Sequence, residues 1–206
     1  EKFLSMVEVE GIEHLEQALA LGKGVILYSA HFGPFNYMAQ WISIKGYDLI
    51  IPVEHLKDER TLDLTLTLRN SQGVQFIPLG GSTPMRKIIK ALRNNQIVLI
   101  TADRAVEGES VEKLFFGEPA CLPIGPVSLS QRTGAALVGA CGWHTSRTHI
   151  GGRFLPLTLE LTEEERNDTG VVMCALINGL EQYIQAYPEQ WVMFSPVWIS
   201  DFAKTS

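Results

Sequence analysis

The stretch that decides the fold class reads VILYSAHFGPFN and runs from Val25 to Asn36. The apolar run over residues 25–30 predicts a buried strand, and Gly33 with Pro34 predicts the turn that ends it. Helical periodicity resumes beyond that turn. Strand–loop–helix junctions are where α/β sheets present reactive side chains, and the imidazole of His31 is suited to general-base chemistry near neutral pH. The alternative is that His31 only satisfies a backbone group at the turn.

Apolar β-rich runs alternate with helical stretches along the rest of the chain. In the first half we expect strands over residues 25–30, 49–53, 74–79 and 97–101, with helices over 11–22, 35–45, 58–70 and onward from Pro84. In the second half we expect strands over 111–116, 135–143 and 148–159, the last two antiparallel, with helices over 126–133 and 169–187. This order predicts an α/β fold whose mixed, mostly parallel sheet is flanked by helices. No linker or repeat interrupts it, so residues 1–206 are expected to form a single domain.

Composition excludes several classes of protein. The net charge is −6, which argues against a nucleic-acid partner because such a surface must neutralise phosphates. No apolar run reaches the length of a membrane span, and residues 1–6 do not resemble a signal peptide. Cys121, Cys141 and Cys174 are expected to be reduced and buried. The five histidines have no metal-ligand spacing with them, so no metal is expected.

Polar side chains follow several of the predicted strands. His31 follows the first strand, Asp103 and Arg104 follow the strand over 97–101, and Glu118 lies in the turn over 115–119. The carboxyl ends of parallel strands meet at one edge of the sheet, so we expect these groups to converge. A histidine, two carboxylates and an arginine suit general-base catalysis with a cation for an oxyanion or a phosphate. The alternative for Asp103 and Arg104 is a structural ion pair.

Known nucleotide and hydrolase motifs are absent. The chain has neither a nucleotide-binding glycine fingerprint nor a Gly-x-Ser-x-Gly nucleophile elbow. Residues 80–82, which read GGS before a predicted helix, are a weak candidate for an anion site, and a turn with a helix cap explains them as well.

A resemblance to a known family rests on ordered sequence blocks. Residues 24–33, GVILYSAHFG, resemble the active-site block of the bacterial lipid A biosynthesis acyltransferases, whose relatives include the mycobacterial phosphatidylinositol mannoside acyltransferases. The likeness continues in LRN at 68–70, ADR at 102–104, FFGEPA at 115–120, PIGP at 123–126, RTGA at 132–135 and YPEQW at 187–191. The blocks occur in family order over about residues 7–198.

The resemblance implies a glycerolipid-acyltransferase-like fold and a fatty acyl transfer. The donor would be a coenzyme A or acyl-carrier-protein thioester, and the acceptor a hydroxyl or amine of a lipid or glycolipid. No metal or redox cofactor is implied. The implied location is the cytoplasm, with peripheral contact at the cytoplasmic face of the inner membrane.

The resemblance also assigns roles, with one departure from the family pattern. His31 would take the proton of the acceptor, while Arg69 and Arg104 would bind a phosphate or the oxyanion, positioned by Asp103. The family motif is His-x4-Asp/Glu, and the acidic position is here Asn36. Asn36 would orient the ring without a charge.

Three hypotheses follow from that departure: a weakened or altered transferase, a transferase in which Glu118 or Asp103 supplies the carboxylate, and a non-catalytic acyl- or lipid-binding module. If the missing charge limits the base, Asn36→Asp should raise turnover.

Membrane contact, if present, needs a local patch. The best candidate is the helix after Pro84, where cationic residues recur near helical spacing. They are Arg86, Lys87, Lys90 and Arg93. A solvated helix face is the alternative interpretation.

Overall fold

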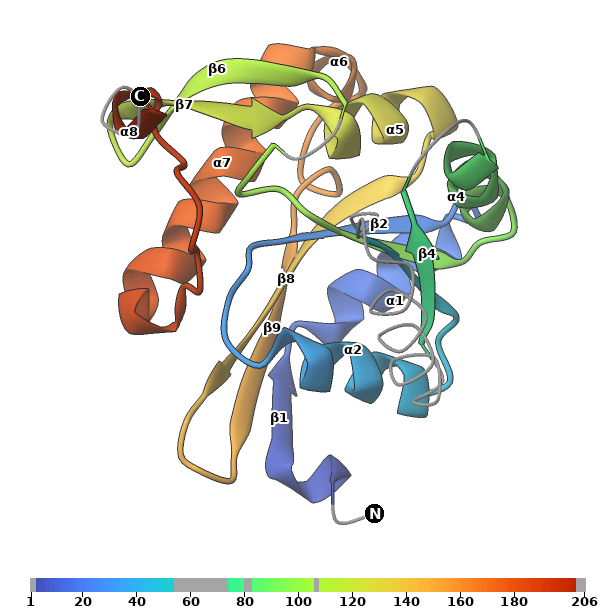
Figure 1. Cartoon of the computed structure of the whole chain (residues 1–206). Helices are drawn as coiled ribbons and strands as arrows, with labels where there is room; N and C mark the ends of the chain where they lie inside the picture. The colour runs from blue at the N-terminus through green and yellow to red at the C-terminus, as the bar shows by residue number, and fades with distance from the viewer. Residues whose placement is uncertain (1–2, 54–73, 80–82, 106–107, 203–206) are drawn as a thin grey trace.

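The computed structural model describes residues 3–53, 74–79, 83–105 and 108–202, which form a layered α/β structure (Figure 1). A seven-stranded sheet has the strand order β1-β9-β8-β2-β5-β3-β4, and β6 and β7 form a separate hairpin. The strands are β1 (Val7–Glu10), β2 (Val25–Ser29), β3 (Leu49–Val53), β4 (Gln75–Pro78), β5 (Ile97–Thr101), β6 (Ser110–Phe115), β7 (Glu118–Pro123), β8 (Ala136–His144) and β9 (Ile150–Pro156). Within the large sheet, β8 and β9 pair antiparallel and the other pairs are parallel. The expected mixed, mostly parallel sheet is confirmed.

Helices cover both faces of this sheet. They are α1 (Ile12–Ala20), α2 (Phe35–Ile44), α4 (Thr83–Arg93), α5 (Gly125–Thr133), α6 (Glu163–Asn167), α7 (Thr169–Ala186) and α8 (Ile199–Phe202), with 3-10 turns η1 (Leu4–Met6) and η2 (Pro188–Gln190). The buried side chains of α1 and α2 belong to one apolar core, and those of α4, α5 and α7 belong to a second core. The sheet separates the two cores.

The central strand β2 shows why the sequence folds this way. All five of its residues are buried, as an interior strand of a parallel sheet requires. Because side chains alternate along a strand, Ile26 and Tyr28 pack into the core of α4, α5 and α7, whereas Val25 and Leu27 pack into the core of α1 and α2. The run that predicted a buried strand therefore joins the two halves of the core.

The register of β2 and β5 determines where the chemistry lies. These strands are adjacent and parallel, and Ser29 is the Cα partner of Thr101. The ladder continues for one more step, since the backbone N–H of Ala102 donates to the carbonyl oxygen of Ser29 at 2.8 Å. His31 and Asp103 each lie two residues beyond this matched pair. The topology therefore brings them to the same edge of the sheet.

Two parts of the fold differ from the sequence prediction. The short β1 is not among the expected strands, yet it pairs in parallel with the edge of β9. Residues 115–119 form the expected turn, but this turn joins β6 to β7 in the separate hairpin and does not lie at the edge of the parallel sheet. Phe116 and Gly117 both have positive φ, 53° and 79°, as a two-residue type I′ hairpin turn requires. Glu118 therefore belongs to the hairpin and not to that edge.

Other expectations have mixed outcomes. Cys141 is buried as expected, but Cys121 and Cys174 are exposed, and all three are free thiols. The helix expected over 58–70 and the candidate anion site at 80–82 lie outside the described residues. Within the described ranges, no helix combines the length and apolar character needed to cross a bilayer.

Candidate active site

A histidine–carboxylate pair lies at the carboxyl edge of β2 and β5. The Nδ1 atom of His31 is 2.8 Å from Oδ1 of Asp103. The backbone N–H of His31 also donates to Oδ2 of the same carboxylate at 2.8 Å. Two contacts from one residue fix the ring relative to the carboxylate, so the pair is held by the strand ends themselves.

The two partners differ sharply in exposure. The Asp103 side chain is fully buried, whereas the His31 side chain is 33% exposed. A carboxylate only accepts hydrogen bonds when it is ionised, and Nδ1 of His31 then donates the hydrogen in this pair. Nε2 then keeps its lone pair and can accept a proton from a bound molecule. A ring held in this way by a buried carboxylate is suited to general-base chemistry.

A segment far along the chain closes over this pair. We call residues 187–198 the C-terminal segment. Its backbone bonds to the loop after β2, because Gly33 N–H donates to the Gln190 carbonyl at 2.8 Å and Val192 N–H donates to the His31 carbonyl at 2.7 Å. Phe32 and Trp191 form an antiparallel bridge between these two hydrogen bonds. The loop is therefore held on both sides of Phe32, the residue that follows the histidine.

Side chains of the same segment reach the strand ends. The indole Nε1–H of Trp191 donates to Oδ2 of Asp103 at 2.9 Å. The guanidinium of Arg104 donates to the Ser195 hydroxyl at 2.8 Å. Asp103 and Arg104, which lie just beyond β5, thus both contact the C-terminal segment.

An aromatic cluster packs beside the carboxylate. Phe115 and Phe116 of the hairpin contact Trp191 at ring-centroid distances of 5.9 and 6.3 Å. Trp198 meets Trp191 edge-on at 5.9 Å, and its own Nε1–H donates to the Phe115 carbonyl at 2.8 Å. The turn of the hairpin does not lie at the edge of the parallel sheet, but its aromatic residues pack against Trp191 beside the site.

Gly33 is required by the backbone geometry next to His31. Its φ is +53°, a left-handed conformation that costs a residue with a Cβ about 1–2 kcal/mol. A Cβ at this position would also overlap the carbonyl oxygen of Gly142 in β8. The chain therefore turns away from β2 against a neighbouring strand, and this close approach sets the start of α2.

The expected hydrogen bond between His31 and Asn36 is not formed. Asn36 lies in the first turn of α2, where its side chain is exposed, and the ring nitrogen that faces the protein is bonded to Asp103. The physical reason is the β2–β5 register, which places a carboxylate beside the ring before the chain reaches α2. Of the two carboxylates considered as substitutes, Asp103 has the orienting position.

The other expected site residues have separate positions. Glu118 is exposed at the start of β7, where Ser200 donates to it at 3.5 Å, and it makes no hydrogen bond to His31 within the described chain. Arg104 is partly buried beside the pair. Arg69 lies outside the described residues. Trp191 lies in the YPEQW stretch at 187–191, and nothing local in the sequence connects it to Asp103.

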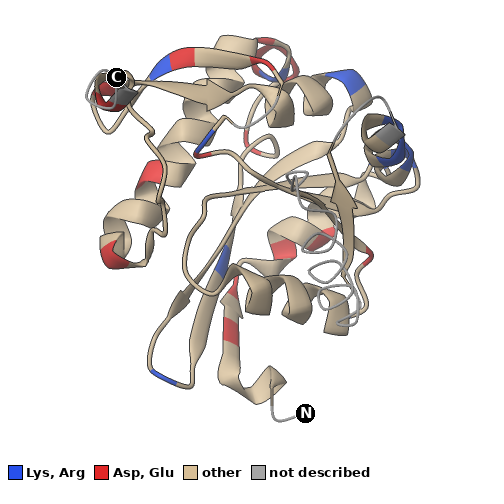
Figure 2. Cartoon of the chain, in the orientation of Figure 1, with Lys and Arg blue, Asp and Glu red and all other residues tan. Residues whose placement is uncertain are grey.

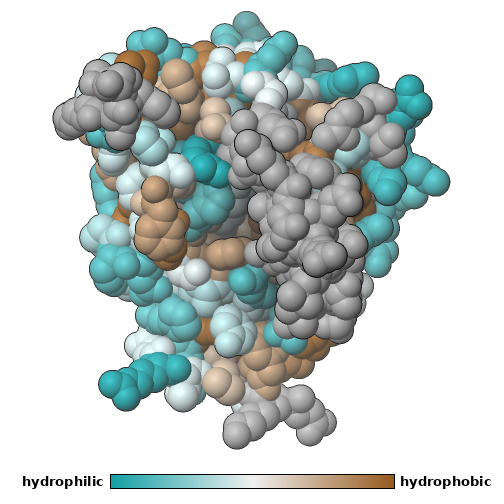
Figure 3. Space-filling model, in the orientation of Figure 1, coloured by the Kyte–Doolittle hydropathy of each residue, from teal (hydrophilic) through white to brown (hydrophobic). Residues whose placement is uncertain are grey.

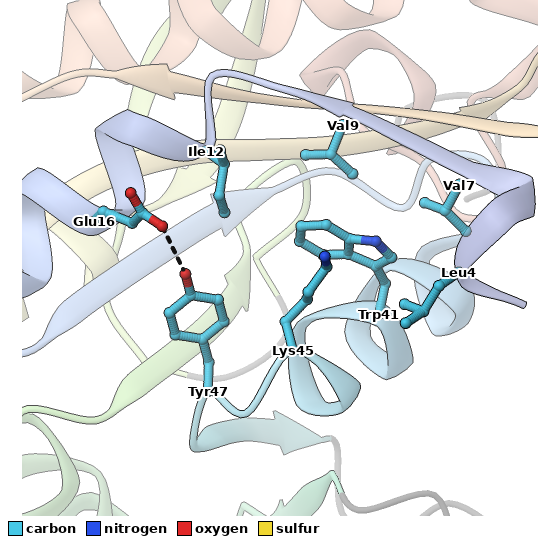
Figure 4. Close-up of a pocket in the computed structure, with 8 residues that line it drawn as sticks. All are labelled: Leu4, Val7, Val9, Ile12, Glu16, Trp41, Lys45 and Tyr47. Carbon is cyan, nitrogen blue, oxygen red and sulfur yellow. Dashed lines mark hydrogen bonds between the residues drawn. The ribbon is translucent and has the colours of Figure 1, made fainter. Parts of the chain in front are cut away.

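A cavity lies away from the histidine–carboxylate pair. It has a volume of about 390 Å³ and is bounded by η1, β1, α1 and the end of α2 (Figure 4). Its lining is mostly apolar, with Lys45 over the Trp41 ring and Tyr47 donating to Glu16 at 3.3 Å. Neither this cavity nor a smaller one of about 100 Å³ between β8, β9 and α7 is lined by His31. The exposed part of the His31 ring is therefore reached from the surface and not through either cavity.

Comparison with known proteins connects this geometry to a family. The family model described as bacterial lipid A biosynthesis acyltransferase matches residues 1–200. The chain belongs to this family. The predicted resemblance is therefore confirmed for the acyltransferase family as a whole.

The curated relatives that the chain matches share one name, which is more specific than that of the family. The chain is 32% identical over 199 residues to a phosphatidylinositol mannoside acyltransferase of Mycobacterium tuberculosis, covering 96% of this chain and 61% of that protein. It is 30% identical over 200 residues to the protein of the same name from Mycolicibacterium smegmatis, covering 96% and 64%. The chain therefore spans about three-fifths of the length of these relatives.

Proposed function

We propose that the protein transfers a fatty acyl group from a thioester to a hydroxyl of a lipid or glycolipid, with His31 as the general base. Membership of the acyltransferase family and the names of the curated relatives support the reaction class. The observation that carries the proposal is the 2.8 Å contact between the exposed His31 ring and the buried Asp103 carboxylate. The expected donor is acyl-coenzyme A or an acyl carrier protein.

The proposed reaction is a direct transfer. Nε2 of His31 takes the proton of the acceptor hydroxyl as its oxygen attacks the thioester carbonyl carbon. Asp103 stabilises the imidazolium that forms, through the hydrogen bond at Nδ1. The tetrahedral intermediate then expels the thiolate, which receives the proton from Nε2, so an ester and a free thiol are released. Arg104, next to the pair, is proposed to face the oxyanion or a phosphate of a substrate.

The alternative of a non-catalytic lipid-binding module arose from the uncharged Asn36. The charge that the motif lacks at this position is present at Asp103, so the transferase is the better supported function. The direct test combines the protein with palmitoyl-coenzyme A, or with a palmitoylated acyl carrier protein, and a phosphatidylinositol mannoside acceptor. Acylated acceptor and stoichiometric free thiol are expected. Tight acyl binding without either product would favour the binding module.

Asn36→Asp is expected to change turnover by less than about threefold, because His31 already has a carboxylate partner and an exposed charge is strongly screened. The variant should be slightly more stable, by about 0.3–1 kcal/mol, since α2 has no acidic residue in its first turn. Steady-state kinetics and urea unfolding check the two expectations. A rise in turnover of tenfold or more would show that residue 36, and not Asp103, orients the His31 ring.

We also propose that α4 provides a contact for an anionic lipid surface. Its buried residues Ile88, Ala91 and Leu92 attach the helix to the core. The exposed residues of the helix include Met85 and no acidic residue, in a protein whose net charge is −6. The helix also has four exposed cations (Figure 2), which are Arg86, Lys87, Lys90 and Arg93. The outer face is hydrophilic in the space-filling view (Figure 3), so attraction would be electrostatic and without deep insertion.

Reversing all four α4 charges to glutamate is expected to abolish flotation with phosphatidylglycerol vesicles at low salt, because each cation near such a surface contributes about 1 kcal/mol. The matched control reverses Lys23, Lys45, Arg132 and Arg147, which are exposed elsewhere and change the net charge equally. This control should float as the wild type does. Equal loss of flotation in both variants, or no flotation of the wild type, would contradict a membrane contact through α4 and favour a soluble acceptor.

A further inference from the structure

Trp191 is in direct contact with the buried member of the histidine–carboxylate pair. Its indole Nε1–H is 2.9 Å from Oδ2 of Asp103, and the indole lies between the C-terminal segment and the aromatic turn of the hairpin. We propose that Trp191 is a positioning residue, whose N–H fixes the rotation of the Asp103 carboxylate so that Oδ1 faces His31. This inference rests on the proposed function and deepens it.

The distribution of donors around Asp103 explains why a third contact matters. Oδ2 receives the backbone N–H of His31 and the indole N–H of Trp191, so both of its partners lie off the reacting ring. Oδ1 is thereby left for Nδ1 of His31. A carboxylate with one fewer donor at Oδ2 could rotate about its terminal bond, because such sp³–sp² torsions are broad. The orientation of the ring would then be less well defined.

The indole is itself held in place by the chain on both sides. The bridge between Phe32 and Trp191 and the flanking backbone hydrogen bonds connect it to the loop of His31. The side chain of Trp191 therefore contacts Asp103, while its chain neighbour Val192 donates to the His31 carbonyl. Such support by a neighbouring residue is typical of preorganised sites.

Trp198 provides a matched control within the same aromatic cluster. Its Nε1–H also makes one hydrogen bond, at 2.8 Å, but the acceptor is the Phe115 carbonyl and not the catalytic carboxylate. Both tryptophans are partly buried. Substituting each by phenylalanine removes an indole N–H and similar ring area from the same cluster, and the two variants differ in whether Asp103 loses a donor.

The test measures kcat and KM for palmitoyl transfer from palmitoyl-coenzyme A to a phosphatidylinositol mannoside. Trp191→Phe is expected to lower kcat by about 10- to 100-fold with little change in KM, the size typical of one lost hydrogen bond to a charged group. Trp198→Phe should keep kcat within about threefold of the wild type. Equal kcat values for the two variants would overturn the proposal, since packing alone would then explain Trp191.

A second comparison separates positioning from folding. In the Asp103→Asn background, adding Trp191→Phe should lower kcat by less than about twofold, because the donor acts only through the carboxylate. A full additional loss would contradict the proposal. If Trp191→Phe does not fold, benzothienylalanine at position 191 replaces the indole N–H by sulfur at nearly the same shape, and the same fall in kcat is expected.

These outcomes also distinguish this inference from the proposed function. If the wild type transfers no acyl group, or if Asp103→Asn leaves transfer unchanged, the proposed function fails. If the wild type and Asp103→Asn behave as expected but Trp191→Phe does not, only the positioning role fails.

Discussion

His31→Ala is expected to lower the rate of acyl transfer by at least about 10³-fold. The remaining rate is that of substrates which are bound together without a general base. General-base catalysis supplies typically about 10²–10⁴ in rate, and no second imidazole contacts Asp103 in the described chain. Binding should persist, because the ring is only one part of the surface proposed to hold the two substrates. The measurement is a single-turnover transfer assay with a radiolabelled acyl thioester.

The control for this variant accounts for the contact that is lost. Removing the ring leaves Oδ1 of the buried carboxylate without its partner, which costs about 1–3 kcal/mol of stability. Circular dichroism and urea unfolding therefore accompany the assay, and His149→Ala, in the exposed turn between β8 and β9, serves as the matched substitution. A folded His31→Ala protein that retains more than about a tenth of the wild-type rate would contradict the role of His31.

Asp103→Asn should cost nearly as much, about 10³- to 10⁴-fold in kcat, by changing the tautomer of His31. The amide oxygen can take the place of Oδ2, where two N–H donors converge. The amide nitrogen then faces Nδ1 and donates to it, so the hydrogen moves to Nε2 and the base has no lone pair for the acceptor. A comparable Asp→Asn change in the serine-protease triad costs about 10⁴. Steady-state kcat with saturating thioester checks this value.

Asp48→Asn is the matched substitution for that measurement, because Asp48 is exposed and Gln96 donates to its side chain at 3.4 Å, a weak contact away from His31. It should leave kcat unchanged. An Asp103→Asn enzyme within tenfold of the wild type would show that the carboxylate is structural, and Asn36 would become the better candidate for orienting the ring.

The central part of the fold could be predicted from sequence because its signals are local. The run over residues 25–30 is apolar throughout and ends in Gly33 and Pro34, and β2 has nearly the expected bounds. The strand β1 was missed because four residues that read VEVE gain their order from a distant partner, β9. The first strand and the turn of the hairpin were predicted, but β7 was missed because Pro119 and Glu118 are unusual in strands, and pairing with β6 overrode their local preference.

The site was predictable only to the level of the sheet edge. Parallel topology was enough to bring His31 and Asp103 to the same edge, and the structure confirms their convergence. The choice between Asn36 and Asp103 as partner of the ring was not predictable, because it depends on the β2–β5 register and on side-chain rotamers. The contact of Trp191 with Asp103 spans 88 positions in the chain and needs the path of the C-terminal segment, for which no local pattern exists.

The measurement that tests the central claim most directly is a double-mutant cycle on His31 and Asp103. If the two residues act as one catalytic unit, the double variant His31→Ala with Asp103→Asn should transfer acyl groups no more slowly than His31→Ala alone, within about threefold. The wild type should exceed all three variants by at least about 10³-fold. Losses that multiply in the double variant, or a wild type no faster than His31→Ala, would contradict a histidine–carboxylate base in this protein.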